Sequence, residues 1–268
     1  MRKWLYFCFI LFTVAFSRIA YTHAQETGSP LPAIDSLLQT AEQAVERNDL
    51  PAAIQASNRA QALCRSSSEL SDRLPSVLFS NAQLNTYGGN YERALQELHE
   101  VLSLNSHAPK PDPILDARTY MQLGIVSFFQ HQWDNALYNY RKAEQLANQL
   151  GNIQGLSIAR NNIANIYQKR GQYAEALAGY LECLRMQRES PSPDTATLCN
   201  TLFNVGSCYE ELDQQAEAGR YMRESYRMAL AVHDPEITVL TLLYFARQDA
   251  EKGRYSMALN RLGQARCT

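Results

Sequence analysis

Hydrophobic residues in this chain follow a helical period inside a longer repeat, and the stretch Ser157–Met186 shows both most clearly. Its apolar residues recur every three to four positions in two runs, which is the spacing of amphipathic helices. A turn sequence, Arg170-Gly171-Gln172, separates the two runs. The small residues Ala164 and Ala176 lie one in each run. Helices can approach closely where both carry small side chains, so this stretch predicts an antiparallel helical hairpin.

The same pattern recurs along almost the whole chain. An alanine of the second helix returns every 40 to 42 residues, at Ala53, Ala94, Ala136, Ala176, Ala218 and Ala258. A second small residue lies twelve positions before each of these, at Ala41, Ala82, Gly124, Ala164, Gly206 and Ala246. Six copies in register predict an all-α fold of about six helix-turn-helix hairpins, with repeats that start near residues 34, 75, 117, 157, 199 and 239. Because one hairpin cannot bury its own apolar face, neighbouring copies should stack.

Large residues at fixed positions complete the pattern. In three copies the residues are Leu123-Gly124, Trp133, Ala136, Tyr140 and Ala143; Ile163-Ala164, Tyr167, Gly171, Tyr173, Ala176 and Tyr180; and Val205-Gly206, Tyr209 and Ala218. This pattern resembles the tetratricopeptide repeat (TPR) family, and the resemblance implies a right-handed solenoid over residues 34–268. The chain departs from the family's usual period of 34 residues. The additional residues fall in segments such as Pro109–Pro113, and similar long-period arrays occur in bacterial sensory and regulatory proteins.

The first 24 residues differ in kind from the repeats. Arg2 and Lys3 precede an apolar run over residues 4–16, and Thr22-His23-Ala24 offers small residues at the positions that a signal peptidase requires. We therefore predict a signal peptide over residues 1–24, a linker over residues 25–33, and export to the periplasm. The alternative is an uncleaved amino-terminal anchor, although the run is short for a membrane span. No apolar run of 18 or more residues follows, so we expect no membrane span after the signal peptide.

The net charge and the reactive residues give little support for nucleic-acid binding, catalysis or metal binding. The formal net charge is −2, and no concentrated basic region indicates nucleic-acid binding. The five histidines are scattered, and no phosphate loop, dinucleotide fingerprint or metal-ligand spacing occurs. We therefore predict no catalytic residues, no metal and no cofactor. Five cysteines would remain after cleavage, of which we expect Cys183 and Cys208 to be small buried hydrophobic residues.

The resemblance also implies a binding surface. In TPR proteins the first helix of each hairpin lines a concave groove that binds peptides or helices. The corresponding residues here are Phe79, Arg118, Met121, Ile125, Phe128, Asn161, Asn162, Asn165, Lys169 and Asn204, with Gln168, Asn200 and Ser207 on the same helices. Asparagine can donate to and accept from a peptide backbone at once, and apolar residues beside it could hold side-chain anchors. The alternative is that Phe128 packs inward and that the asparagines cap helices or face water.

These observations predict a non-catalytic scaffold or adaptor of the cell envelope that binds a protein or peptide. The alternative is a periplasmic sensory module of a longer signalling or transcriptional regulator. The last copy bears on both hypotheses, because its second helix, from Tyr255 to about Cys267, has no capping helix behind it. An unshielded terminal repeat exposes apolar surface. We therefore expect that either a partner covers this surface or the chain belongs to something longer.

Overall fold

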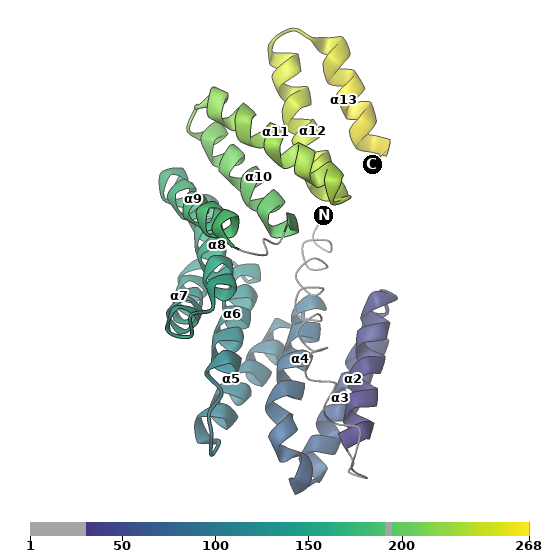
Figure 1. Cartoon of the computed structure of the whole chain (residues 1–268). Helices are drawn as coiled ribbons and strands as arrows, with labels where there is room; N and C mark the ends of the chain where they lie inside the picture. The colour runs from purple at the N-terminus through teal and green to yellow at the C-terminus, as the bar shows by residue number, and fades with distance from the viewer. Residues whose placement is uncertain (1–30, 191–194, 268) are drawn as a thin grey trace. The chain divides into compact units, whose positions relative to one another are not determined.

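The computed structural model describes residues 31–190 and 195–267, and the regular elements in these ranges are all helical (Figure 1). This confirms the predicted all-α fold class. The predicted signal peptide and residues 25–30 of the predicted linker lie outside the described residues. The first described helix begins at Leu31, three residues before the predicted start of the repeats.

Close contacts divide the chain into two compact units, with the boundary after Asn139. The first unit contains the helices α2 (Leu31–Glu46), α3 (Leu50–Ser66), the 3-10 helix η2 (Ser68–Arg73), α4 (Leu74–Tyr87), α5 (Tyr91–His107), α6 (Pro113–Phe129) and the start of α7 (Trp133–Gln149). The second unit contains the rest of α7 and the helices α8 (Ile153–Lys169), α9 (Tyr173–Glu189), α10 (Thr195–Glu211), α11 (Gln215–Ala231), α12 (Pro235–Glu251) and α13 (Tyr255–Cys267). Within each unit, consecutive helices pack on one another as in a TPR solenoid, and each predicted repeat start lies inside the first helix of a hairpin.

The helix starts explain where the loop residues of the sequence belong. Asp234 is the N-cap of α12, and its side chain accepts a hydrogen bond from the backbone N–H of Ile237. Pro235 follows as the first helical residue, where its missing N–H costs nothing. Asp112 and Pro113 begin α6 in the same way. Pro113 and Pro235 therefore lie at helix starts, where proline is well tolerated.

The small residues of the repeat lie where helices cross. All twelve are buried, as the pattern predicts. A Cβ atom added to Gly206 would lie 3.1 Å from Cγ of Met222, which is closer than ordinary carbon contacts. A Cβ atom added to Gly179 would lie 3.0 Å from Cβ of Ala164. The backbones of α8 and α9, and of α10 and α11, thus approach closely because these side chains are small or absent.

Buried cysteines form part of this core. Cys64, Cys183, Cys199 and Cys208 are free thiols with little or no exposed surface. Burial raises the pKa of the Cys183 and Cys208 thiols to about 12. At neutral pH both are therefore protonated and weakly nucleophilic. This confirms the prediction that they act as small hydrophobic residues.

Candidate functional site

The predicted groove residues fall in both units, and the two groups are described separately. In the first unit, Phe79 of α4 is 4% exposed, so it belongs to the core. The guanidinium of Arg118 on α6 lies over its ring, 4.6 Å from the centroid. A cation over an aromatic face is attracted by the ring quadrupole. Phe79 therefore supports Arg118 from below, and only the arginine is exposed to solvent.

The three apolar groove residues predicted on α6 are half-buried. Met121, Ile125 and Phe128 lie on one face of the helix because they are four and three positions apart. Phe128 makes edge contacts with Phe129 and with Trp133, at ring-centroid distances of 5.8 Å and 5.2 Å. Phe128 therefore contributes to an aromatic cluster inside the unit. Met121 and Ile125 keep part of their surface exposed on the same face.

In the second unit, polar side chains gather on the two neighbouring first helices. We define the polar strip as Asn161, Asn165 and Gln168 of α8 together with Asn200, Asn204 and Ser207 of α10, all of them partly exposed. Gln168 Nε2 donates to Ser207 Oγ at 3.4 Å, which links the helices. Asn204 Nδ2 donates to Asn200 Oδ1 at 3.1 Å. These bonds hold the amides in defined orientations.

A buried tyrosine holds the polar strip from below. The Tyr180 hydroxyl on α9 lies 2.5 Å from Asn165 Oδ1 and 3.0 Å from Gln168 Oε1. Tyr180 has no exposed surface, and burial raises the pKa of its hydroxyl, which remains a donor at neutral pH. Asn161 differs from its neighbours because its Oδ1 is buried and has no hydrogen-bond partner. Such an acceptor costs roughly 1–3 kcal/mol until a donor reaches it.

The other two predicted residues of α8 are placed differently. Asn162 is only 6% exposed, so it lies below the surface formed by the strip. Lys169 is exposed and is the last residue of the helix. The contribution of Tyr180 was not anticipated from the sequence, where it matched the family pattern only as a large core residue.

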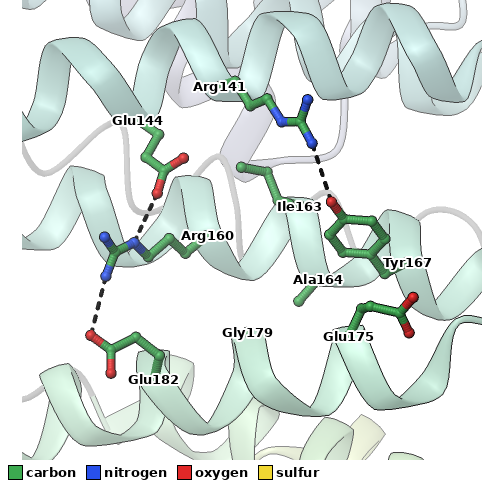
Figure 2. A pocket seen from close by; sticks show the side chains of 9 residues that line it. All are labelled: Arg141, Glu144, Arg160, Ile163, Ala164, Tyr167, Glu175, Gly179 and Glu182. Atoms are coloured by element: carbon green, nitrogen blue, oxygen red, sulfur yellow. Dashed lines mark hydrogen bonds and ion pairs between the residues drawn. The ribbon is translucent and has the colours of Figure 1, made fainter.

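A cleft between α7, α8 and α9 is a second surface feature of this unit (Figure 2). It has a volume of about 320 Å³, and its lining includes Ala164 and Gly179. Arg160 lies between Glu144 and Glu182, with N–O distances of 2.9 Å and 3.2 Å, and Arg141 donates to the Tyr167 hydroxyl at 3.2 Å. The charged groups of the cleft thus pair mainly with one another. They tie three helices together, and no nucleophile lies beside a base among them.

The described residues offer neither a metal-binding cluster nor a membrane-spanning helix. Within residues 31–190 and 195–267, no group of three or more histidine, cysteine, aspartate or glutamate side chains could hold a metal ion. In the same ranges, no helix combines the length and the apolar character that crossing a bilayer requires. The polar strip is therefore the best-defined candidate site in the described chain.

Comparison with known proteins agrees with this architecture. Residues 155–231, which run from α8 to the end of α11, match the sequence profile of the tetratricopeptide repeat. The chain therefore contains tetratricopeptide repeats. It is 25% identical over 179 residues to the human outer dynein arm-docking complex subunit 4, a match that covers 66% of this chain and 26% of the relative. The chain thus spans about a quarter of the length of the curated relatives it matches.

Two solved structures have a similar fold. BtubC (BKLC) from P. vanneervenii is 17% identical with a TM-score of 0.65, over 90% of this chain and 91% of that one. A Rap protein solved in complex with Competence and Sporulation Factor is 13% identical with a TM-score of 0.67, over 92% and 68% of the two chains. At these identities the likeness concerns the fold alone. TPR folds typically serve as non-catalytic protein-binding scaffolds.

Proposed function

We propose that this TPR protein is a non-catalytic scaffold that binds an extended segment of a partner protein along the polar strip. The observation that carries the proposal is the set of half-buried amides on α8 and α10, oriented by Tyr180 and by one another. An extended peptide presents alternating N–H and C=O groups, and asparagine and glutamine side chains can pair with both.

The preorganised side chains favour binding for a second reason. Immobilising a flexible side chain on association costs roughly 0.5–1.5 kcal/mol. The side chains of Asn165 and Gln168 are already ordered in the folded protein, because the Tyr180 hydroxyl is shared between their side-chain oxygens. A ligand therefore loses less free energy to ordering here than on the freely exposed Lys169.

A displayed library of random peptides selected on the purified protein would supply a ligand for testing the strip. We expect Asn165→Ala with Asn204→Ala to weaken a selected peptide roughly 30-fold, since each lost hydrogen bond contributes about 1 kcal/mol. Asn148→Ala is the matched control, because Asn148 is exposed on α7 of the same unit. Titration by calorimetry measures the change. Equal affinity of parent and double variant, or loss of binding on Met121→Ala instead, would contradict the assignment to the strip.

We further propose that the scaffold works in the cell envelope after export. Support comes from Arg2 and Lys3, the apolar run over residues 4–16 and the cleavage site at Thr22-His23-Ala24. We expect mature protein from the periplasmic fraction to begin at Gln25, as measured by intact mass. Recovery of a membrane-bound form that retains Met1 would favour the uncleaved anchor instead.

A sensory role is the alternative proposal. The Rap protein with a similar fold was solved in complex with Competence and Sporulation Factor, so a helical array of this fold can bind such a factor. In that case the polar strip would bind the signal, and an output domain of the same protein would respond. The gene sequence after the codon of Thr268 distinguishes the two roles. A membrane span or a DNA-binding domain there would favour the sensor.

A further inference from the structure

The cleft between α7, α8 and α9 lies at a position of the hairpin that other repeats fill with side chains (Figure 2). We define the pair position as two residues, one three places after the small residue of the first helix and one three places after the alanine of the second. In four hairpins the pair position holds Ala44 with Ala56, Asn85 with Glu97, Tyr209 with Tyr221, and Asp249 with Arg261. Asn85 donates to Glu97 at 2.8 Å, and Arg261 donates to Asp249 at 2.7 Å. In the hairpin of α8 and α9 the two residues are Tyr167 and Gly179, and both line the cleft.

The aromatic pair of the next hairpin shows which group would complement the cleft. The rings of Tyr209 and Tyr221 stack, with centroids 5.5 Å apart and 12° between their planes. In the repeat register Tyr209 corresponds to Tyr167, and Tyr221 corresponds to Gly179. Tyr167 therefore lines a space of about 320 Å³ at the place where the register puts a second ring in the next hairpin. A planar ring that enters this space can stack on Tyr167 as Tyr221 stacks on Tyr209.

Contacts at the two ends of the cleft limit the length of a ligand (Figure 2). At one end Arg160 of α8 bridges Glu144 of α7 and Glu182 of α9. At the other end Arg141 of α7 donates to the hydroxyl of Tyr167. Arg160 and Tyr167 are seven residues apart on α8, which is roughly 10 Å of helix. This span suits one ring with a short polar end, and it favours a small molecule over a length of peptide chain.

The charged groups at the tyrosine end of the cleft restrict the polar end of the ligand. Among the residues that the structure describes, no acid pairs with Arg141 and no basic residue pairs with Glu175. In the next hairpin the counterpart of Glu175 is Glu217, which pairs with Arg220 at 2.8 Å. The guanidinium of Arg220 in turn lies 4.5 Å from the centroid of the Tyr221 ring. A cation beside the ring thus has a counterpart within this chain, and Arg141 adds a group that pairs with an anion.

We propose that the cleft binds a free aromatic α-amino acid. The ring stacks on Tyr167 beside Gly179, the ammonium pairs with Glu175, and the carboxylate pairs with the guanidinium on α7. An amine without a carboxylate brings a like charge to Arg141, and an acid without an ammonium does the same at Glu175, so both are disfavoured. No residue of the polar strip lines the cleft, so this site does not depend on the peptide binding proposed above.

Calorimetric titration of the purified protein with L-tryptophan and with L-phenylalanine tests the proposal. We expect both to bind. L-leucine, tryptamine and indole-3-propionate should each bind at least roughly fivefold more weakly, because each lacks the ring or one of the two charges. Tyr167→Leu should weaken L-tryptophan roughly fivefold, and Glu175→Gln roughly tenfold. Glu217→Gln is the matched control, because it makes the same change in the hairpin where Tyr221 already stacks on Tyr209.

Thermal melts followed by circular dichroism establish that each variant is folded before it is titrated. Absence of binding of both aromatic amino acids at millimolar concentration would overturn the proposal. So would equal affinity for L-leucine, or L-tryptophan binding that neither Tyr167→Leu nor Glu175→Gln changes. Equal affinity for tryptamine would mean that Arg141 takes no part and that the ligand is not an amino acid. A peptide with adjacent arginine and tyrosine that binds where the free amino acids do not would assign the cleft to a partner protein's side chains.

Discussion

Replacing Ala176 with arginine should unfold the second unit or destabilise it severely. Ala176 has no exposed surface and lies in one cluster with Ala164 and Tyr180, where α8 and α9 cross. An arginine there must either bury an unpaired charge or separate the helices. Both cost several kcal/mol, on the order of 3 or more. Thermal unfolding followed by circular dichroism should show a melting temperature lower by roughly 10 °C or more, or no cooperative transition for this unit.

The same helix provides the control for this experiment. Ala178 is exposed and lies two positions further along α9. Ala178→Arg adds the same side chain to solvent and should change stability by no more than about 0.5 kcal/mol. If both arginine variants melt like the parent, the framework alanine does not lie at the helix crossing and the repeat register is wrong.

Truncation of Tyr180 to alanine is the second change with a large expected effect. Its ring fills the space between α9, α8 and α10, in a cluster with Leu184 and Leu202. Removing a buried aromatic side chain loses its transfer free energy and leaves a cavity, which together cost about 3–5 kcal/mol. Urea unfolding should therefore show a lower midpoint with an unchanged slope, because a change in midpoint alone reports stability.

Tyr180→Phe separates the two functions of this residue. It keeps the ring and removes only the hydroxyl that contacts Asn165 and Gln168. The expected loss is about 1 kcal/mol of stability. Affinity for a peptide at the polar strip should fall as well, since the amides lose their support. A Tyr180→Ala protein as stable as the parent would mean that the ring is not a core residue.

The sequence by itself determined the repeat and its hairpins. Small residues such as Ala164 and Ala176 are needed where two helix backbones approach closely. In this sequence they recur in pairs twelve positions apart, which marks the crossing point of each hairpin. Apolar residues at helical spacing then define which side of each helix is buried. Both signals are local and recur six times. A repeat that matches the pattern weakly can therefore still be assigned from the register of the other repeats. The helices, their order and the burial of Cys183 and Cys208 followed from these rules.

Only the tertiary structure decided how the candidate site is arranged. Asn161, Asn162 and Asn165 look alike in the sequence, yet Asn162 is buried, Asn165 accepts from Tyr180 and Asn161 Oδ1 has no partner. These differences depend on the angle at which α9 and α10 pack against α8. A hydrogen bond forms only within a narrow range of distance and angle between its donor and acceptor. Ser207, one of the two partners of Gln168, lies 39 residues further along the chain on another helix. The pairing therefore depends on the spatial register between helices, which hydrophobic spacing along one helix does not specify.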